Sequence, residues 1–323
     1  MNRSSKGKVV ATARSFCRYE GLHKRLITDA GYELLLHARP TPMGPDELSE
    51  LAADADALIL GLDICDASVF ARAPRLKVVA RQGVGVDAVD LAAAARHGVV
   101  VTNTPGANTI GVAELVFGLI LSLSRRLTEA NAEVKSGGWP HLMGWELHGR
   151  TLGLIGLGQI GRAVASRAIA FGMNVQAYDP FISEHAAIRL VTLDALLETS
   201  NIISLHAPLT AANHHLLDSS AFDKMLPGTV VINTARGGLI DESALARALE
   251  DGRLAGAACD AFENEPPAGA PFLSLPNFIA TPHLGAATLE SALRMAEAAS
   301  RNALKVLAGE EGANVVALRT GGS

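Results

Sequence analysis

The amino-acid sequence predicts an α/β protein made of two doubly wound parallel-sheet domains. Short apolar runs rich in Val and Ile alternate with Ala- and Leu-rich stretches at helical spacing, which is typical of parallel strands joined by crossover helices. The alternation occurs in two series separated by a long apolar helix, and a glycine-rich turn follows the first strand of the second series. With 323 residues, 49% of them hydrophobic, the chain is long enough for two domains with sizeable cores.

The first series predicts five strands joined by helices. The strands are expected at Lys8–Ala11, Glu33–Leu36, Ala57–Leu60, Val78–Arg81 and Val99–Thr102. Helices are expected to begin near Gly21, Asp46, Ser68 and Asp87. The last of them runs through a four-alanine segment to Arg96, and Gly98 supplies its stop signal.

One long helix is expected from Asn108 to Lys135, polar at both ends and apolar in the middle, with Gly137 and Gly138 ending it. A helix this apolar must cover its surface on another domain or another subunit. Its most apolar part, residues 112–123, also contains Glu114 and is too short for a membrane span, which takes about twenty residues.

The second series predicts six strands with helices between them, which matches a dinucleotide-binding sheet. These strands are expected at Thr151–Ile155, Asn174–Tyr178, Ile202–His206, Thr229–Asn233, Gly256–Ala261 and Phe278–Thr281. A final helix is expected from Leu289 to Leu307, followed by an extended tail over Ala313–Leu318.

Composition excludes several classes of function. Twenty-eight Lys and Arg against 33 Asp and Glu give a net charge of −5, too mild to predict a nucleic-acid surface. Cys17, Cys65 and Cys259 lack the spacing of a disulfide framework or a zinc site and fit a reducing compartment. The polar, basic first residues and the short apolar stretch ending at Arg14 do not resemble a secretory leader. We therefore expect a cytoplasmic protein with no metal site and no nucleic-acid or membrane partner.

The glycine-rich turn is the first functional signal. Strand Thr151–Ile155 runs directly into Gly156-Leu-Gly158-Gln-Ile-Gly161, and a helical segment follows. In such a loop Gly156 allows the tight turn, Gly158 lets a pyrophosphate approach the backbone, and Gly161 lets helix and strand pack closely. The free N–H groups of the helix start then face the phosphates.

An acidic residue at the expected distance strengthens this interpretation. Asp179 lies eighteen residues after Gly161, at the end of the next strand. A carboxylate there accepts hydrogen bonds from the adenosine ribose and repels a 2′-phosphate, which favours NAD over NADP. A purely structural role, capping the turn before Pro180, is the alternative. Methyltransferases also combine a glycine loop with a ribose-binding acid, so the fold alone leaves the chemistry open.

Three further polar residues follow predicted strands of the same sheet. They are Arg236 in Asn-Thr-Ala-Arg-Gly-Gly-Leu-Ile-Asp, Glu265 in Cys-Asp-Ala-Phe-Glu-Asn-Glu-Pro-Pro, and His283 in Thr-Pro-His-Leu-Gly-Ala-Ala-Thr. Open α/β sheets bind ligands at the carboxyl ends of their strands. Taken singly, each residue also has an ordinary explanation as a solvated turn, a surface acid or a loop donor.

Together these segments resemble the D-isomer-specific 2-hydroxyacid dehydrogenases, the family that includes D-3-phosphoglycerate dehydrogenase. The resemblance covers essentially the whole chain. Besides the glycine loop and the three segments above, it rests on Arg81-Gln-Gly-Val-Gly-Val-Asp87, Asn103-Thr-Pro-Gly106 and His206-Ala-Pro-Leu-Thr210. The resemblance implies an NAD-dependent oxidoreductase that transfers a hydride between NAD(H) and a small 2-hydroxy or 2-oxo acid.

By this resemblance Arg236, Glu265 and His283 are the catalytic residues, and their chemistry suits the reaction. Protonated His283 can donate a proton to the developing alkoxide, because its ordinary pKa of about 6.5 lies near working pH. A neighbouring Glu265 would orient the imidazole and raise its pKa. Arg236 can hold the substrate carboxylate through two parallel hydrogen bonds.

The resemblance also implies binding residues for both ligands. Substrate contacts are expected from Arg81, Val84, Gly85 and Arg236, with the backbone of the 83–85 loop meeting the acid as an anion nest. Cofactor contacts are expected from Gly156, Gly158, Gln159, Ile160, Gly161, Asp179, Pro180, His206, Pro208, Thr234, Ala235, Asp260 and Gly285. The other histidines (His23, His37, His97, His141, His148, His185, His214 and His215) are expected on the surface or in loops, without a ligand role.

The family architecture implies a Rossmann-type NAD-binding domain, residues 106–288, inserted into a flavodoxin-like substrate domain of residues 1–105 plus 289–323. The active site is then expected in the cleft between the domains, and the helix from Asn108 implies a homodimer. No regulatory segment follows Ser323 in this sequence, so serine feedback is not expected.

Two positions depart from phosphoglycerate dehydrogenases and leave the substrate open. Asp63, in Gly61-Leu-Asp63, lies where those enzymes usually have a basic Arg-Ser type segment, and a phosphate would favour a cation there. At position 82 this chain has Gln where the family often has a small residue. Glyoxylate or hydroxypyruvate reduction is therefore the alternative within enzymes. An NAD-sensing corepressor is the alternative from another class, and the sequence names neither the reaction direction nor an effector.

Overall fold

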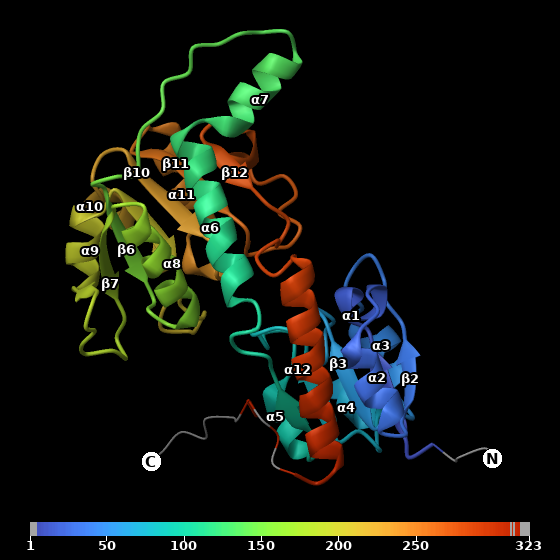
Figure 1. Cartoon of the computed structure of the whole chain (residues 1–323). Coiled ribbons are helices and arrows are strands. Elements are labelled where there is room, and N and C mark those ends of the chain that lie inside the picture. Colours follow the sequence, from blue (N-terminus) through green and yellow to red (C-terminus); the bar gives the residue numbers. More distant parts are fainter. Residues whose placement is uncertain (1–4, 311, 313, 317–323) are drawn as a thin grey trace. The chain divides into compact units, whose positions relative to one another are not determined.

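The computed structural model describes residues 5–310, 312 and 314–316 of the chain. The chain divides into two compact units, Met1–Asn108 with Thr288–Ser323 and Thr109–Ala287. Each unit is a parallel sheet covered by helices on both faces (Figure 1). The predicted α/β class, with a parallel sheet in each of two domains, is therefore confirmed.

The first unit contains a five-stranded sheet in the order β2-β1-β3-β4-β5. This is the flavodoxin-like order, and every pairing is parallel. The strands are β1 (Lys8–Ala11), β2 (Glu33–Leu36), β3 (Ala57–Leu60), β4 (Val78–Arg81) and β5 (Val100–Thr102). Only β5 differs from the prediction, beginning one residue later.

Alternate residues of these strands pack on opposite faces, as the two-residue period of a strand requires. Val10, Leu58 and Val79 contribute to the core under α3 (Pro45–Ala52), α4 (Ala67–Arg72) and α5 (Leu91–Arg96). Val9 and Ile59 contribute to the other core. That face is covered by α1 (Arg14–Arg18), α2 (Leu22–Asp29) and α12 (Leu289–Leu307), which brings the end of the chain back onto the first sheet.

Two helices of this unit differ from expectation. The short helix α1 was not predicted, and α5 begins at Leu91 rather than near Asp87. The cause at α5 is a cap: the Asp90 carboxylate accepts the Ala93 N–H at 2.8 Å, which fixes the helix start there. Helix α12 has the predicted bounds.

The expected single helix after Pro105 is wrong, because two helices occupy this segment. They are α6 (Thr109–Ser124) and α7 (Leu127–Lys135). Arg126 between them has a left-handed backbone, with φ of 52°. The Ser124 carbonyl accepts the N–H of Trp145 at 2.9 Å, so it no longer serves the next turn of the helix. We call the excursion between these two residues, 125–144, the arm.

The second unit contains a seven-stranded parallel sheet in the order β12-β11-β10-β9-β6-β7-β8. Counted from β6, this is the dinucleotide-binding order 3-2-1-4-5-6 with β12 added at one edge. The strands are β6 (Thr151–Ile155), β7 (Asn174–Tyr178), β8 (Arg189–Leu190), β9 (Ile202–Leu205), β10 (Thr229–Asn233), β11 (Leu254–Cys259) and β12 (Phe278–Ala280). The two-residue β8 was not predicted, and β9, β11 and β12 end one or two residues earlier than expected.

Helices cover both faces of this sheet (Figure 1). Helices α6 and α8 (Gln159–Ala170) pack on one face, where Val116 and Val164 join Leu152 and Leu154 in a shared core. Helices α9 (Leu193–Thr199), α10 (Ser219–Lys224) and α11 (Glu242–Glu250) belong to the core of the other face. Short 3-10 helices span Gly237–Leu239 and Pro271–Ser274.

The predicted extended tail is described only in part. Val315 forms an isolated antiparallel bridge with Thr102, whereas residues 313, 317 and 318 lie outside the described residues. Among the helices that the structure describes, none combines the length and apolar character that a bilayer crossing requires.

Candidate functional site

The glycine loop joins β6 to α8 at the point where the strand order reverses. A Cβ on Gly161 would lie 2.3 Å from the Gly156 carbonyl oxygen, so only glycine permits this close packing of helix and strand. A Cβ on Gly158 would meet no atom within 4 Å, which leaves open space beside the backbone. In the described part of the chain, no side chain caps the start of α8. The loop therefore has the geometry of a pyrophosphate cradle.

Asp179 follows β7 and faces this loop. Its carboxylate accepts the Leu157 N–H at 2.8 Å and the Phe181 N–H at 2.9 Å. The acid thus caps the turn and fastens the glycine loop at the same time. Because a carboxylate offers about four acceptor sites, it can still accept hydrogen bonds from a ribose.

The segment after β9 closes the other side of the glycine loop. A Cβ on Gly156 would lie 2.8 Å from the Ala207 nitrogen, so the two loops are in contact. The His206 ring hydrogen-bonds Ser204 Oγ at 2.9 Å, and burial lowers the pKa of this histidine to about 4. The ring is therefore neutral at working pH. Pro208 lies further along, where its carbonyl accepts the Asn213 amide at 2.8 Å.

Arg236 lies in a tight turn after β10. The Asn233 side chain accepts the Ala235 N–H at 3.0 Å and donates to the Arg236 carbonyl at 2.9 Å, which fixes the turn. A Cβ on Gly237 would lie 1.9 Å from the carbonyl carbon of Phe262, so this glycine lets the turn pack against the segment after β11. Asn233 was not predicted as a site residue, although an Asn at a strand end is a turn signal.

Glu265 and His283 form a direct pair. His283 Nδ1 lies 3.0 Å from both oxygens of the Glu265 carboxylate. His283 itself has a left-handed backbone, with φ of 56°, in the loop after β12. The side chains, each about one-third exposed, remain accessible.

The electrostatics of the pair follow from this contact. The hydrogen bond and charge of Glu265 raise the pKa of His283 above its usual 6.5, despite partial burial. Burial alone would raise the pKa of Glu265, but the hydrogen bond and charge of His283 outweigh it and lower that pKa. The Arg236 charge makes the smallest contribution and acts to lower both pKa values. The turn that carries Arg236 packs against Phe262, whose N–H donates to the Glu265 carboxylate at 3.2 Å. The structure thus brings the three predicted catalytic residues together.

Asp260 organises the loop that carries His283. Its carboxylate accepts the Thr281 hydroxyl at 2.6 Å and the N–H groups of Leu284 and Gly285 at 2.6 and 2.7 Å. These bonds grip the loop on both sides of His283. Thr281 was not singled out from the sequence, because only the folded loop reveals its bond to Asp260.

Thr234 supplies an independent observation that fits a dinucleotide cofactor. Its hydroxyl is buried, and it has no hydrogen-bond partner among the described residues. Thr234 lies at the end of β10, on the carboxyl side of the sheet where nicotinamide would bind. With the open space at Gly158 and the uncapped start of α8, this orphaned hydroxyl fits a bound dinucleotide.

The predicted substrate loop lies in the first unit. The Gly83 N–H donates to the Thr104 hydroxyl at 3.0 Å, and Asn103 donates to the Val84 carbonyl at 2.8 Å. Val84 is exposed. Arg81 is buried, and its guanidinium donates to the Gln82 carbonyl at 2.8 Å.

The two departures from the family pattern have structural explanations. The buried Asp63 carboxylate accepts the Thr12 hydroxyl at 2.6 Å and the Met43 N–H at 2.9 Å. Its oxygens are therefore engaged within the first unit rather than presented to a ligand. Gln82 is also buried, and it donates to Ser15 Oγ at 2.9 Å and to the Ala292 carbonyl at 3.2 Å.

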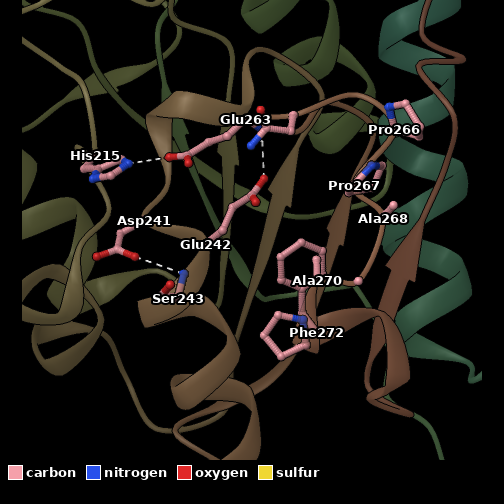
Figure 2. A pocket seen from close by; sticks show the side chains of 13 residues that line it. His215, Asp241, Glu242, Ser243, Glu263, Pro266, Pro267, Ala268, Ala270 and Phe272 are labelled. Atoms are coloured by element: carbon pink, nitrogen blue, oxygen red, sulfur yellow. Dashed lines mark hydrogen bonds and ion pairs between the residues drawn. The ribbon is translucent and has the colours of Figure 1, made fainter.

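A pocket of about 340 Å³ lies beside the segment that carries Glu265, but its charge does not suit an acid substrate. Asp241, Glu242 and Glu263 line it, together with the Pro266–Phe272 loop (Figure 2). Three acidic residues would repel a carboxylate or a pyrophosphate. We therefore do not assign this pocket to the predicted reaction.

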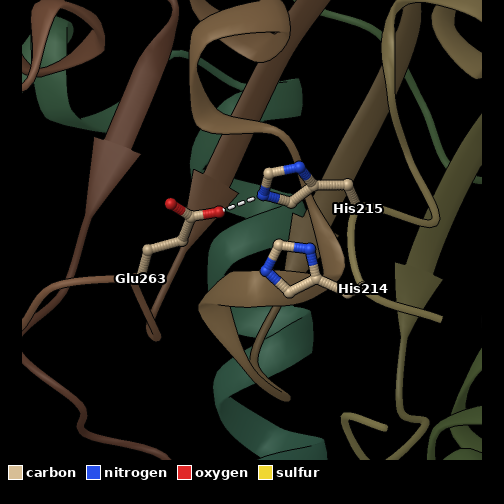
Figure 3. A group of neighbouring side chains, drawn as sticks. All are labelled: His214, His215 and Glu263. Carbon is tan, nitrogen blue, oxygen red and sulfur yellow. Dashed lines mark hydrogen bonds and ion pairs between the residues drawn. The ribbon is translucent and has the colours of Figure 1, made fainter. Parts of the chain in front are cut away.

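Two of the histidines that were expected to have no ligand role lie beside a third side chain of a type that can bind a metal ion. His214 and His215 lie next to Glu263 in the second unit, 48 residues further along the chain from His215 (Figure 3). Both lie in a surface loop, as expected, but a third ligand-type side chain lies beside them, which was not expected. His23, also expected at the surface, is buried in α2 and hydrogen-bonds the Phe16 carbonyl at 3.1 Å.

Comparison with known proteins identifies the family. Residues 117–285 match the model of the D-isomer specific 2-hydroxyacid dehydrogenase, NAD binding domain. The chain belongs to this family. The match confirms the resemblance, and it confirms NAD as the cofactor expected for the second unit.

Relatives in this family differ in length. A D-3-phosphoglycerate dehydrogenase of Methanocaldococcus jannaschii is 42% identical over 85% of this chain and 54% of the relative. The chain thus spans about half the length of such relatives. A glyoxylate reductase of Korarchaeum cryptofilum is 39% identical over 88% of this chain and 90% of the relative. Among solved structures, the TT0316 protein of Thermus thermophilus is 39% identical, with a TM-score of 0.89 over 96% of this chain and 100% of that one.

Proposed function

We propose that this protein interconverts a small 2-hydroxy acid and its 2-oxo acid, with NAD as the hydride carrier. The observation that carries the proposal is the hydrogen-bonded pair of Glu265 and His283, with Arg236 close enough to alter the pKa values of both. An acid–base group beside a guanidinium, on a sheet with a dinucleotide loop, meets the needs of this reaction. Bound NAD accepts or supplies the hydride, and side chains of this protein transfer the proton and bind the acid.

Each side chain has a defined part in this proposal. Protonated His283 donates from its free nitrogen, Nε2, to the alkoxide oxygen, and in the opposite direction the neutral ring removes the hydroxyl proton. Glu265 holds Nδ1 and keeps the ring oriented and charged. Arg236 binds the substrate carboxylate and polarises the carbonyl that is reduced.

The residues proposed to bind the ligands follow from the same scheme. The cofactor phosphates would lie at Gly156, Gly158 and Gly161, with the N–H groups of Gln159 and Ile160. The ribose would lie at Asp179 beside Pro180. The remaining cofactor contacts are proposed at His206, Pro208, Thr234, Ala235, Asp260 and Gly285. For the substrate acid we propose the N–H groups of Val84 and Gly85, with Arg81 adding positive charge.

Two substrates of different size are the leading candidates. The sequence identity to phosphoglycerate dehydrogenases favours 3-phosphoglycerate. Coverage of 90% of a glyoxylate reductase favours the smaller glyoxylate or hydroxypyruvate. The engagement of Asp63 in internal hydrogen bonds removes one argument against a phosphate, because that carboxylate is not presented to a ligand.

We further propose that the protein is a cytoplasmic homodimer whose first unit is the substrate-binding domain. Helix α7 has no buried residue, and Trp139 and Met143 in the arm are 91% and 77% exposed. Such apolar exposure favours contact with a second copy of the chain. Three free cysteines, two of them buried, fit a reducing compartment.

A substrate panel tests the proposal. Purified protein with NADH is offered 3-phosphohydroxypyruvate, hydroxypyruvate, glyoxylate and pyruvate, and the loss of reduced nicotinamide is followed by its absorbance. We expect oxidation with at least one of these acids, and the ranking identifies the substrate. Tight NADH binding without oxidation by any of them would contradict the enzyme proposal and favour an NAD sensor.

A further inference from the structure

A second cluster of ligand-type side chains lies outside the proposed catalytic residues. The side-chain nitrogens of His214 and His215 and a carboxylate oxygen of Glu263 all lie within 4.8 Å of one another (Figure 3). His214 and Glu263 are exposed and His215 is half-buried, so an ion from solvent can reach all three.

The local backbone explains how two adjacent histidines come to face the same point. In an extended chain, neighbouring side chains point to opposite sides. His215 instead has a left-handed backbone, with φ of 53°, and its N–H donates to the Gly238 carbonyl at 2.8 Å. The two imidazole rings consequently lie with their centroids 3.9 Å apart. This uncommon conformation is held by the turn that also carries Arg236.

Glu263 is fixed from the opposite side. Its N–H donates to a Glu242 carboxylate oxygen at 2.9 Å, and its own carboxylate contacts the His215 ring. None of the thirteen described residues lining the adjoining pocket is Lys or Arg (Figure 2). Three carboxylates, those of Asp241, Glu242 and Glu263, therefore border the described part of this site, which favours a divalent cation.

We propose that His214, His215 and Glu263 bind one divalent transition-metal ion of the Zn²⁺ class. Two imidazole nitrogens and one carboxylate oxygen are the donors that Zn²⁺ accepts, whereas Mg²⁺ and Ca²⁺ prefer oxygen ligands alone. Zn–N distances near 2.0–2.1 Å place tetrahedral ligands roughly 3.4 Å apart, so rotations of these accessible side chains must close the present spacing. The adjoining pocket leaves room for water as a fourth ligand.

The site goes beyond the proposed dehydrogenase function and does not depend on it. A bound ion would replace the hydrogen bond between His215 and Glu263. It would tie the loop before α10 to the segment that carries Glu265 two residues further on. We therefore expect the ion to stiffen the support of the catalytic residues without contacting the substrate.

Metal titration of the intact protein tests the proposal. Protein stripped with a chelator is titrated with Co²⁺, followed by its visible absorption, and with Zn²⁺ by calorimetry. We expect one equivalent to bind, and binding at least tenfold weaker in His214→Gln and in Glu263→Gln. The control variants His185→Gln and His283→Gln should bind as the original protein does, and Mg²⁺ should not compete.

Thermal unfolding provides a second readout that needs no activity. A ligand that binds only the folded state raises the melting temperature. Zn²⁺ should raise it in the original protein and in His185→Gln, but not in Glu263→Gln. Absence of binding, or equal affinity in Glu263→Gln and the original protein, would overturn the site and leave His215 and Glu263 a simple hydrogen-bonded pair. Because neither readout uses substrate, this failure is separate from a failure of the dehydrogenase proposal.

Discussion

The charge states of Glu265 and His283 depend on each other. The carboxylate raises the pKa of the imidazole, and the imidazole lowers the pKa of the carboxyl. Within the pH range between these two values the pair is an imidazolium beside a carboxylate. This is the form that a proton donor in reduction requires.

Replacing Glu265 by Gln should therefore move the pH profile. In the reductive direction kcat/KM reports the free enzyme, and it should fall as pH rises through the raised pKa of His283. Glu265→Gln removes the cause of the raised pKa, so this falling limb should move to lower pH. Glu198→Gln, at an exposed acid elsewhere in the second unit, is the control. An unchanged profile in Glu265→Gln would show that the carboxylate does not set this pKa.

Asp179 is predicted to exclude a 2′-phosphate from the ribose site. Asp179→Asn removes the negative charge but keeps an oxygen for the Leu157 N–H. We expect the preference of kcat/KM for NADH over NADPH to fall about tenfold or more, since a factor of ten corresponds to about 1.4 kcal/mol. Asp194→Asn, at an exposed acid of the same unit, should leave the preference unchanged. If Asp179→Asn keeps the full preference for NADH over NADPH, then Asp179 is not the residue that discriminates between the two cofactors.

At the junction of β6 and α8, one glycine is required for packing and another for the proposed cofactor binding. Both Gly158 and Gly161 belong to this junction, yet a Cβ would meet a backbone oxygen at one and open space at the other. The same substitution should consequently have different effects at these two positions.

Gly161→Ala should destabilise the fold by about 1–3 kcal/mol, because the added methyl would lie 2.3 Å from the Gly156 oxygen. Gly158→Ala should change unfolding by less than about 1 kcal/mol but weaken NADH binding at least tenfold, because the methyl occupies the space proposed for the pyrophosphate. Denaturant unfolding and NADH titration distinguish the two variants. Equal NADH affinity in Gly158→Ala and the original protein would refute the cradle.

Elements with strong local patterns could be predicted from the sequence. Strands such as β1, β3 and β10 are continuous apolar runs bounded by turns, and their predicted bounds agree with the structure. The end of α6 differs from the prediction because of a tertiary contact. The Ser124 carbonyl bonds Trp145, which a helical pattern cannot reveal, and α6 ends there.

The candidate site likewise has one part that the sequence could predict and one part that it could not. The proposed catalytic residues could be expected together because parallel strands end at one edge of a sheet. His214, His215 and Glu263 could not, because their proximity depends on a left-handed residue and on segments 48 residues apart. The Asp63 carboxylate could not be assigned either, since its partners Thr12 and Met43 come from distant loops.

The arm carries large apolar side chains that a single chain leaves exposed to solvent. It leaves the second unit after Ser124 and returns at Trp145, and no residue of α7 is buried. Leu127 and Val134 on α7 are half exposed, in addition to Trp139 and Met143. The apolar surface on this arm supports the proposed homodimer.

Light scattering coupled to gel filtration should give the mass of two chains. The double change Trp139→Ser with Met143→Ser should raise the dimer dissociation constant at least tenfold, because burying each large apolar side chain is worth about 1.5–3 kcal/mol. Phe181→Ser, which removes a side chain that is 85% exposed elsewhere in the second unit, is the matched control. A monomer in the original protein would reject the dimer.

If His283 is the acid–base group of an NAD-dependent reaction, His283→Ala should abolish most of the turnover without affecting the cofactor. NADH affinity and turnover of the best acid from the substrate panel are measured on the same preparation, with His185→Ala as the control. Loss of general acid–base catalysis should reduce kcat by about 10²–10⁴-fold while NADH binding changes little. Turnover at the original rate in His283→Ala would show that His283 is not the acid–base group.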